Sequence, residues 1–515
     1  MSRHATSRAY VFLLLFSLAL LRSGPAVAAP ILSVSPTSLS AQTAAGSNAP
    51  PQTVQVANGG NGNLRWSIVG PVPSWLAISP TSGTISGTGS APVTVNFLTS
   101  ALAPGGYAPS FQVTSNTGSS VTVSVKLTVS GSTPPPTLVG PQPTITCPAD
   151  AVDILPGQSI PLIVNSFTGS TTFCLRAGVH SVTSSTRPKT GNTFVGEYGA
   201  ILDGTGWTTA DDTQAAFRAH NEDIDYVTIR NLVIRNMPQH GIQAFYVMAD
   251  HWTIEYNEIA SNKVGLEFAP DFSVRNNYIH HNVGNPSSPN PAERGGGYVA
   301  VAAHNTTFDS NEIAYNGPEQ KVVQSSNVTF RNNFVHHNVR DGIWYDSNTN
   351  AGALIDGNRV EDNGRNGISF ESSIGTTIRN NTVRRNAGDA VFISMSQNAQ
   401  IYSNSLEANF GGIEYFLNCA SLSLGEDVKN NAASDNTVVI GTQSNTYASA
   451  FSYTFSSCTS TQVAPYLNGS KNLTFSRNGY RVPSLSWDRY FLWGAWKGWT
   501  EWRVLGQDVS GSLSQ

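Results

Sequence analysis

The sequence predicts an all-β protein in which a β-sandwich precedes a parallel β-helix closed by end caps. The main observation is the pattern Asn-x-(Val/Ile/Leu)-x-x-Asn, which returns eight times at steps of 26, 20, 34, 22, 25, 23 and 23 residues. The repeats begin at Asn231, Asn257, Asn277, Asn311, Asn333, Asn358, Asn381 and Asn404. A period near 23 residues, with β-branched residues and no helical spacing, indicates coils that stack on one another. Upstream, short alternating strands broken by Gly, Pro and Ser indicate the sandwich.

The repeated asparagines have a structural explanation. An amide side chain that turns inward and stacks on the amide of the next coil both donates and accepts hydrogen bonds along the column. We therefore expect asparagine ladders inside the β-helix, and we assign these asparagines no catalytic role.

Residues 1–28 have the pattern of a secretory signal peptide. Arg3 and Arg8 precede an apolar run from residue 11 to 21, and Ala26-Val27-Ala28 supplies small residues for cleavage near Ala28. The run is short for a bilayer, and no later segment reaches ~18 uninterrupted apolar residues. We therefore expect an exported protein, secreted or periplasmic, with no membrane span.

The remaining elements follow in order along the chain. Residues 31–131 are expected to form the sandwich, with strands at 53–56, 93–97 and 121–125, and a Pro-rich linker follows at 132–143. The β-helix is expected over 144–486. Because an open β-helix exposes strand edges at both ends, we expect a cover at 151–167 and an aromatic cap at 487–515. Five tryptophans supply the apolar mass of this cap, and Thr500-Glu501 is expected to start a short helix.

Four cysteines remain after export. Their order favours two local disulfides, Cys147 with Cys174 and Cys419 with Cys458, although four cysteines allow three pairings. Metal binding by these cysteines is less favoured because no C-x-x-C spacing or histidine partner spacing occurs.

Composition restricts the partners. Only 12% of residues are charged and the net charge is -4, which provides no basic surface for nucleic acid. We expect a monomer with a polysaccharide or glycan as its partner.

The predicted sandwich carries a family resemblance. Residues 33–39 and 73–83 resemble the BACON family, immunoglobulin-like modules often found in bacterial carbohydrate-active proteins. The resemblance covers nearly the whole domain. It implies an immunoglobulin-like sandwich that spaces or targets the rest of the chain.

The repeat region also carries a resemblance. Residues 169–180 and 193–204 are similar to the opening coils of secreted right-handed parallel β-helix repeat proteins, the superfamily that includes pectate lyases. Residues 341–348, 367–371 and 502–508 extend the likeness. It implies right-handed winding, export and glycan processing as a theme. It identifies no substrate, because this fold hosts lyases, hydrolases, esterases, epimerases and adhesins.

One outward column of residues has the composition of a catalytic site. Counting eight residues from the second Asn of successive motifs aligns Gln324, Asp346, Glu371 and Ser394. Strand alternation turns the neighbouring apolar residues inward, namely Ile343, Tyr345, Ile368 and Phe370. Adjacent coils lie about 4.8 Å apart, so Asp346 and Glu371 are expected to lie over one another on the exterior, with one pKa raised.

Paired carboxylates of this kind cleave glycosides, because one protonates the leaving oxygen while the other attacks or activates water. We therefore predict Asp346 and Glu371 as catalytic residues. Trp344, on the same face, is predicted to stack on a sugar ring. The remaining predicted substrate-binding residues are Gln324, His336, His337 and Arg340.

Three alternatives for this pair stay open. The carboxylates can be solvated residues neutralised by Arg340 and Arg365. They can instead hold a divalent cation, for which Ca²⁺ is the candidate, although we predict neither a required cofactor nor a metal ligand set. Residues 319–325 resemble the Glu-x-x-x-x-Lys-Ser segment of alginate and chondroitin lyases, yet Gln324 replaces the lysine and Lys321 is expected to face inward.

We predict an exported polysaccharide-active protein, a glycoside hydrolase or polysaccharide lyase with its groove on the outer face of the β-helix. The alternative is a noncatalytic extracellular glycan-binding or adhesion or matrix protein on the same scaffold. The carboxylate pair favours the enzyme. The absence of polygalacturonase, pectin methylesterase and calcium-dependent pectate lyase motifs favours the binding protein.

Overall fold

The computed structural model describes residues 29–44, 48–99, 105–130, 139–208, 214–245, 249–268, 270–284, 294–347, 352–441, 446–454, 456–486 and 489–515. The chain divides into two compact units, at Val129 and Ser130, and each is considered separately. The predicted signal peptide lies outside the described residues. Among the described residues, no helix is long and apolar enough to cross a membrane.

The first unit is a sandwich of two antiparallel sheets. One sheet has the order β1 (Leu32–Ser35), β3 (Gln52–Asn58), β7 (Gly89–Phe97), β5 (Leu76–Ser79). The other has the order β2 (Ser38–Ala44), β10 (Ser120–Ser130), β9 (Ser110–Ser115), β4 (Asn63–Val69), β6 (Ser82–Ser86), with β8 (Gly105–Tyr107) on β10. Alternate residues of each strand enter a common core, such as Val54 and Val56 of β3 and Val93 and Val95 of β7. The predicted sandwich is confirmed.

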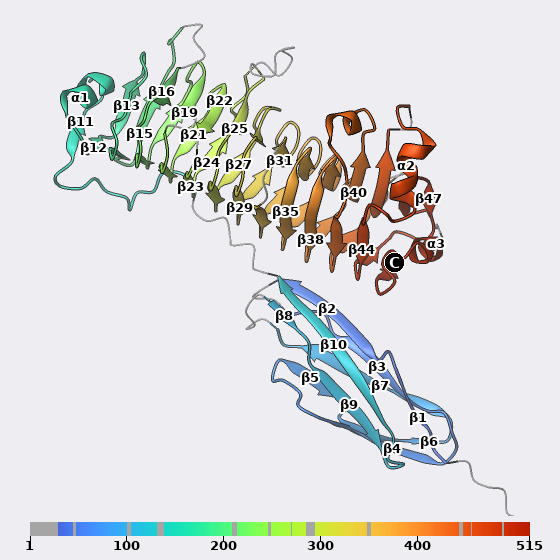
Figure 1. The fold of residues 1–515 in the computed structure, drawn as a ribbon. Helices are drawn as coiled ribbons and strands as arrows, with labels where there is room; N and C mark the ends of the chain where they lie inside the picture. Colours follow the sequence, from blue (N-terminus) through green and yellow to red (C-terminus); the bar gives the residue numbers. More distant parts are fainter. Residues whose placement is uncertain are drawn as a thin grey trace, which may run out of the picture. The chain divides into compact units, whose positions relative to one another are not determined.

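The second unit is a parallel β-helix whose coils stack from α1 (Ile160–Ser166) to α3 (Trp499–Val504), as Figure 1 shows. In the described residues three sheets run along it. Sheet 1 contains β11 (Val152–Ile154), β12 (Thr172–Leu175), β14 (Thr193–Gly196), β17 (Thr228–Arg230), β20 (Thr253–Glu255), β23 (Ser273–Arg275), β26 (Thr307–Asp309), β29 (Thr329–Arg331), β32 (Ala353–Asp356), β35 (Ile374–Arg379), β38 (Gln397–Tyr402), β41 (Ala432–Ser434) and β44 (Thr474–Ser476).

Sheet 2 contains β13 (Gly178–Ser181), β15 (Ala200–Asp203), β18 (Val233–Arg235), β21 (Glu258–Ala260), β24 (Tyr278–His280), β27 (Glu312–Ala314), β30 (Phe334–His336), β33 (Arg359–Glu361), β36 (Thr382–Arg384), β39 (Ser405–Glu407), β42 (Thr437–Val439), β45 (Gly479–Arg481) and β48 (Ser512–Ser514). Sheet 3 contains β16 (Ala215–His220), β19 (His240–Phe245), β22 (Val264–Phe268), β25 (Gly296–Val301), β28 (Lys321–Val323), β31 (Ile343–Asp346), β34 (Ile368–Glu371), β37 (Asp389–Ser394), β40 (Gly411–Leu417), β43 (Ser449–Tyr453), β46 (Phe491–Trp493) and β47 (Trp496–Lys497).

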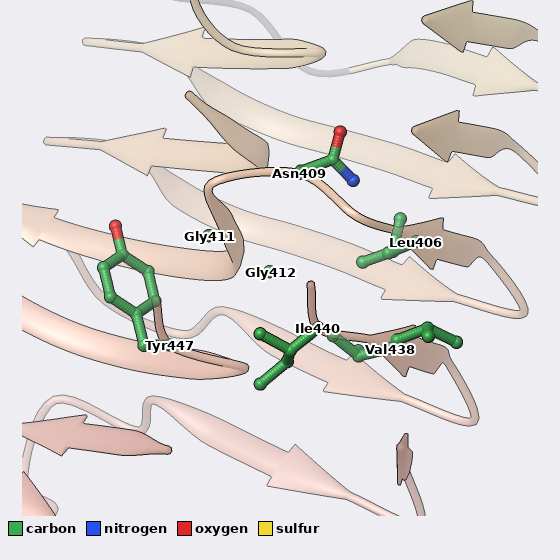
Figure 2. Close-up of a pocket in the computed structure, with 8 residues that line it drawn as sticks. Leu406, Asn409, Gly411, Gly412, Val438, Ile440 and Tyr447 are labelled. Atoms are coloured by element: carbon green, nitrogen blue, oxygen red, sulfur yellow. The ribbon is translucent and has the colours of Figure 1, made fainter. Parts of the chain in front are cut away.

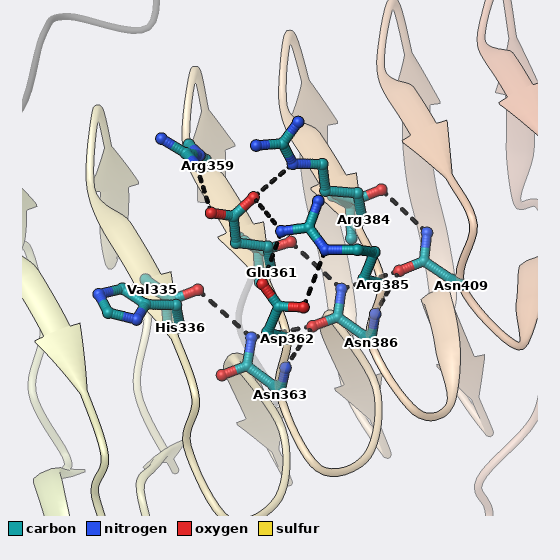
Figure 3. A network of polar contacts seen from close by, with 12 residues as sticks. Val335, His336, Arg359, Glu361, Asp362, Asn363, Arg384, Arg385, Asn386 and Asn409 are labelled. Atoms are coloured by element: carbon teal, nitrogen blue, oxygen red, sulfur yellow. Dashed lines mark hydrogen bonds and ion pairs between the residues drawn. The ribbon is translucent and has the colours of Figure 1, made fainter.

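Asparagine ladders fasten the two corners that flank sheet 2. At the corner before sheet 2, Nδ2 of each asparagine donates to Oδ1 of the next over 2.9–3.1 Å, in the series Asn257, Asn277, Asn311, Asn333, Asn358, Asn381, Asn404, Asn436, Asn478. The corner after sheet 2 repeats the arrangement with Asn262, Asn282, Asn316, Asn338, Asn363, Asn386, Asn409. Figure 3 shows Asn363, Asn386 and Asn409 of this second ladder. The predicted ladders are confirmed.

The first predicted repeat, at Asn231, is one residue out of register. Leu232 occupies the ladder position, because its backbone N–H donates to Oδ1 of Asn257. Asn231 lies at the preceding corner position, where φ is 62°. Asparagine tolerates this left-handed conformation better than most residues, which explains why the sequence pattern matched a neighbouring asparagine.

Both ends of the β-helix are covered. At the first end, Ile160 and Val164 of α1 are buried, and Phe167 packs edge-on against Phe173 over 5.6 Å between ring centroids. At the other end, α3 contributes the fully buried Trp502, whose ring stacks on Phe491 at 4.9 Å. The predicted end caps are therefore confirmed, although Trp487 lies outside the described residues.

The disulfides pair as the cysteine order predicted. Cys147 bonds to Cys174 near the first coils, and Cys419 bonds to Cys458 near the last. The second bond ties the segment around the 3₁₀ turn Ser421–Leu424 to the residue that precedes α2 (Ser460–Leu467) by two positions. Both bonds therefore lie close to the ends, where coils have a neighbour on only one side.

Candidate functional site

The predicted carboxylate pair lies on the exterior of sheet 3. Strands β31 and β34 pair in parallel with Trp344 beside Ser369 and Asp346 beside Glu371. The residues predicted to point inward are fully or almost fully buried in the core, namely Ile343, Tyr345, Ile368 and Phe370. The predicted register and orientation of Asp346 and Glu371 are confirmed.

Glu371 is held from two sides. Its Oε2 accepts a hydrogen bond from Nε1 of Trp344 at 2.8 Å, and its Oε1 accepts one from Nη2 of Arg365 at 2.7 Å. Burial raises the pKa of Glu371, the carboxylates of Asp341 and Asp346 raise it further, and Arg365 opposes both effects. The predicted rise in one of the two pKa values is therefore confirmed.

Asp346 has a different environment. Its Oδ2 accepts a hydrogen bond from Nζ of Lys321 at 3.3 Å, and its Oδ1 accepts one from the Ser347 hydroxyl at 3.0 Å. The two adjacent carboxylates therefore differ in their hydrogen-bond partners and in their burial. Asp346 is paired with an ammonium and a hydroxyl, while Glu371 is the more buried group and has a raised pKa.

Trp344 points outward but offers no open face. Its side chain is covered by Arg340, Lys321 and Arg365, whose charged ends lie 4.7, 4.9 and 5.7 Å from the ring centroid. Only 7% of the residue is exposed. This arrangement argues against the predicted stacking of a sugar on Trp344. The ring instead fixes Glu371 and supports three cations.

A buried aspartate anchors the same cluster from the preceding corner. Oδ1 of Asp341 accepts a hydrogen bond from the Ser369 hydroxyl at 2.6 Å and lies 3.4 Å from Nε of Arg365. Ser369 in turn accepts a hydrogen bond from Nδ2 of Asn366 at 3.0 Å. Arg365 is therefore held between Asp341 and Glu371, and Arg340, predicted to bind substrate, lies beside it over Trp344.

Gln324 does not share the column with the carboxylates. The pairing partner of Asp346 in β28 is Val323, and Gln324 follows at an exposed corner with φ of 53°. The corner between Asn316 and β28 is one residue shorter than the next one, so counting eight residues overshoots. The predicted position of Gln324 is therefore wrong by one residue.

The same shift changes the orientation of Lys321. Val322, not Lys321, points into the core, where it pairs with Tyr345. Lys321 consequently faces outward and reaches Asp346. The prediction that Lys321 faces inward is wrong. Lys321 lies on the outer face of sheet 3, together with Asp346 and Glu371.

His336 and His337 lie apart from this cluster. His336 belongs to β30 of sheet 2, and His337 occupies the following corner. Figure 3 shows His336 beside a network of ion pairs on sheet 2, in which Glu361 contacts Arg384 and Arg359 and Asp362 contacts Arg385. The two histidines share a coil with Trp344 and Asp346, as predicted, but they occupy a different sheet.

The sequence did not reveal a second acidic cluster on sheet 3. The Tyr447 hydroxyl lies 2.7 Å from Oδ1 of Asp389 and 2.7 Å from Oε2 of Glu414. The Tyr447 hydroxyl is thus shared between the two carboxyl groups, which it holds close together. Burial and the adjacent Glu414 raise the pKa of Asp389 well above its usual range. Glu414 lies in the same outward column as Trp344, Ser369 and Phe392 of the preceding coils. Continuing the residue count into this later coil would therefore have placed Glu414 in the column.

A small hollow lies beside Tyr447, at the corner between sheets 2 and 3 (Figure 2). Its lining is Leu406, Asn409, Gly411, Gly412, Val438, Val439, Ile440 and Tyr447. This lining is mostly apolar and contains none of the carboxylates. The chemistry-bearing residues therefore lie on the open face of sheet 3 and not in this hollow.

The arrangement does not favour a calcium ion between Asp346 and Glu371. Lys321 and Arg365 already contact oxygens of these carboxylates. Ca²⁺ prefers six to eight oxygen ligands, and the two cationic groups compete with it for these carboxylate oxygens.

Comparisons with known proteins agree with this architecture. The family model described as "Right handed beta helix region" matches residues 217–353, and the model "Periplasmic copper-binding protein (NosD)" matches residues 288–472. The model "Viral BACON domain" matches residues 31–130. No curated protein matches the chain.

Three solved structures are similar to parts of the chain. The A-module of the mannuronan C-5 epimerase AlgE6 of Azotobacter vinelandii shares 16% identity, with a TM-score of 0.49, over 69% of this chain and 94% of its own. The AlgE4 A-module of the same organism shares 16% identity, with a TM-score of 0.41, over 57% and 89%. A PapD-like domain of human CEP192 shares 16% identity, with a TM-score of 0.17, over 24% and 97%. Sequence identities and TM-scores this low do not define a function.

The chain contains a parallel β-helix, of which residues 217–353 match the right-handed β-helix model. It also contains an immunoglobulin-like sandwich that matches the BACON model over residues 31–130. Its face on sheet 3 carries two acidic clusters interleaved with arginine and lysine.

Proposed function

We propose that the protein is an extracytoplasmic polysaccharide-active enzyme that cleaves glycosidic bonds on the outer face of sheet 3. The observation that carries this proposal is the lateral pairing of Asp346 and Glu371 in different environments. A carboxyl group whose pKa is raised by burial, beside a carboxylate held by a lysine, provides an acid next to a nucleophile. Two disulfides support the extracytoplasmic location.

The roles follow from those surroundings. Glu371, with its raised pKa, donates a proton to the glycosidic oxygen as the bond to the anomeric carbon breaks. The Asp346 carboxylate attacks the anomeric carbon, and water then releases the sugar while Glu371 accepts the proton back. Neighbouring strands lie about 4.8 Å apart, which suits the separation of about 5 Å found in retaining enzymes.

The cations of this face favour an acidic glycan. Arg340, Lys321 and Arg365 gather over Trp344, and Arg294 lies two coils earlier at 3.2 Å from Glu319. Guanidinium groups bind carboxylates in two-point contacts, so a uronate can replace an acidic side chain as the partner of an arginine. Arg340 is therefore the proposed substrate-binding residue of this cluster.

Elimination is the second candidate reaction, and Lys321 favours it. A uronate can be cleaved without water when a base removes the proton on the carbon beside its carboxylate, a carbon–carbon double bond forms, and the glycosidic oxygen leaves with a proton from an acid, for which Glu371 is the candidate. Lys321 faces outward and lies within reach of the same surface as Asp346. The two reactions give different products, since only elimination creates an unsaturated uronate.

A polysaccharide panel tests the proposal. Purified mature protein is incubated with plant, algal and animal polysaccharides, and both reducing ends and unsaturated uronates are followed. Hydrolysis produces reducing ends alone, whereas elimination produces both signals. We expect Glu371→Gln and Asp346→Asn to lower the rate of hydrolysis at least 100-fold, and Lys321→Met to abolish elimination selectively.

The matched control is Glu407→Gln, an exposed carboxylate on sheet 2, which should leave the rate unchanged. Full activity in both Glu371→Gln and Asp346→Asn would remove this site assignment. Retention of a glycan without product, in affinity gels, would identify the noncatalytic binding protein instead.

A further inference from the structure

Two His-His-Asn corners on sheet 2 have no role in the proposed cleavage. His280 ends β24 and His281 follows at the corner, while His336 ends β30 and His337 follows. In each case the second histidine has a left-handed backbone, with φ of 54° and 53°. The next residue in each case, Asn282 or Asn338, belongs to the buried ladder, so the corner is rigidly placed.

The geometry of the two corners is nearly identical. Nδ1 of His280 lies 2.8 Å from Nδ1 of His281, and Nδ1 of His336 lies 2.8 Å from Nδ1 of His337. The first ring of each pair stacks on a neighbouring aromatic ring, Tyr278 at 3.8 Å or Phe334 at 4.0 Å.

A carboxylate lies behind each first histidine. Nε2 of His280 is 3.3 Å from Oε1 of Glu258, and Nε2 of His336 is 3.1 Å from Oε1 of Glu312. A carboxylate oxygen accepts hydrogen bonds, so Nε2 is the donor nitrogen in both contacts. A ring that donates from Nε2 has Nδ1 left as its metal-binding nitrogen.

This combination has the form of a metal-chelating site. A ligating histidine commonly donates its second N–H to a carboxylate, which fixes the ring and increases its basicity. With metal–nitrogen bonds of about 2.0–2.1 Å, two ligands at a right angle lie about 2.9 Å apart, whereas tetrahedral ligands lie about 3.3 Å apart. The observed 2.8 Å suits the right angle of a square or tetragonal centre.

We propose that His280 with His281, and His336 with His337, form two chelating sites for a divalent transition metal of tetragonal preference, such as Cu²⁺ or Ni²⁺. Each metal is held by two Nδ1 atoms, and water completes its coordination from the exposed side, where His281 and His337 reach solvent. Ala314 separates His280 from His336 in the pairing order of sheet 2. The two sites are thus two coils apart, about 10 Å.

Tyr315 connects the two sites. Its ring stacks on His281 at 5.0 Å and on His337 at 5.0 Å, so it lies between the second histidines of the pairs. The coil that contains Tyr315 carries no histidine pair at this corner. Two separate sites, and not a continuous histidine row, are therefore expected.

The corner also provides a conservative variant. Asn236 occupies the equivalent position of an earlier coil with φ of 58°, so asparagine is accommodated there. His281→Asn and His337→Asn should therefore remove one ligand each without disturbing the coil. His304→Asn is the control, since His304 lies at another corner, with Nδ1 2.8 Å from the Ser326 hydroxyl.

The test is calorimetric titration of the mature protein, carrying no histidine tag, with Ni²⁺ and with Cu²⁺. We expect two sites for the wild type and the His304→Asn control, one site for each single variant, and none for the His281→Asn/His337→Asn double variant. Electron paramagnetic resonance of the Cu²⁺ form should show coupling to two nitrogens at each site. Circular dichroism confirms that the variants are folded.

Other outcomes overturn the proposal. An absence of binding by the folded wild type would mean that the paired nitrogens share only a hydrogen bond. Two sites persisting in the double variant would place the metal elsewhere. Neither result depends on glycan cleavage, so this inference and the proposed function fail independently.

Discussion

Nε1 of Trp344 donates a hydrogen bond to Oε2 of Glu371 between adjacent coils of sheet 3, at 2.8 Å. This bond stabilises the ionised carboxylate and so lowers the pKa of Glu371 against the larger effect of burial. Trp344→Phe removes the donor and keeps an aromatic ring beneath the cations. One hydrogen bond contributes about 1 kcal/mol, so the pKa of Glu371 should rise by roughly 0.7.

The measurement is the pH dependence of glycan cleavage. If Glu371 is the acid, the alkaline limb of the profile should move to higher pH in Trp344→Phe by roughly 0.7. Phe392→Leu, a substitution on the same column two coils later, is the control and should leave the limb in place. A limb that moves to lower pH in Trp344→Phe would contradict the role of Glu371 as the acid.

The carboxyl pair at Tyr447 predicts an unusual pH dependence of stability. Burial and Glu414 raise the pKa of Asp389 well above the value of about 4 expected in the unfolded chain. The folded state therefore holds this proton more tightly, and stability is lost as pH rises from about 4 toward the raised pKa. Asp389→Asn removes that loss.

Thermal melting at pH 5 and pH 8 checks this prediction. The wild type should lose more stability than Asp389→Asn on going from the lower to the higher pH. Asp362→Asn is the control, because Arg385 lowers the pKa of Asp362, whose contribution is lost only as pH falls below about 4, so this variant should keep the wild-type slope between pH 5 and pH 8. Equal slopes for the wild type and Asp389→Asn would show that Asp389 titrates normally.

The asparagine ladder should be the most sensitive part of the coils. Asn358 accepts hydrogen bonds from the backbone N–H and Nδ2 of Asn333, and it donates from Nδ2 to Asn381 and to the Phe330 carbonyl. Asn358→Ala leaves several buried groups without partners. We expect a loss of about 3 kcal/mol in the free energy of unfolding.

Urea denaturation followed by circular dichroism measures this loss. Thr382→Ala, on the outward side of the next coil, is the control and should change stability by less than about 0.5 kcal/mol. A comparable change in both variants would mean that the ladder contributes no more than an ordinary surface residue.

Much of the fold follows from the periodicity of the sequence, because most coils of the repeat region supply an inward asparagine at a ladder corner. Register was harder to predict than architecture. The corner before β28 is one residue shorter than the corner before β31, so Gln324 was assigned to the wrong position and Lys321 to the wrong orientation. Asn231 matched the repeat although Leu232 holds the ladder position.

The candidate site was predicted only where the coil length is constant. Asp346 and Glu371 lie at equal distances from their motif asparagines, and counting aligned them correctly. Tyr447 belongs to the long connection between β42 and β43, which has no periodic signal, so its contacts with Asp389 and Glu414 required coordinates. The covering of Trp344 by three cations also depends on side-chain conformations that alternation does not specify.

Asp508 ends the first asparagine ladder and joins it to the C-terminal cap. Its Oδ1 accepts hydrogen bonds from the backbone N–H and Nδ2 of Asn478, both at 2.9 Å, as a ladder asparagine would. Its Oδ2 accepts from the Tyr480 hydroxyl at 2.6 Å and from Nε1 of Trp502 at 3.1 Å. Both side-chain oxygens of Asp508 must accept hydrogen bonds to satisfy these donors. An asparagine has only one such oxygen, which explains the aspartate at the last ladder position.

Two substitutions separate these roles. Asp508→Asn keeps the ladder acceptor but directs an amide toward the indole N–H of Trp502, so a loss of about 1–2 kcal/mol is expected. Asp508→Ala removes both sets of bonds and should lose about 3–4 kcal/mol. Because a loosened cap exposes the edges of the last strands, Asp508→Ala should also self-associate in light scattering, while Asp508→Asn stays as the wild type. Equal stability of the two variants would mean that the ladder bonds to Asn478 contribute nothing, and the cap would then depend on the packing of Trp502 alone.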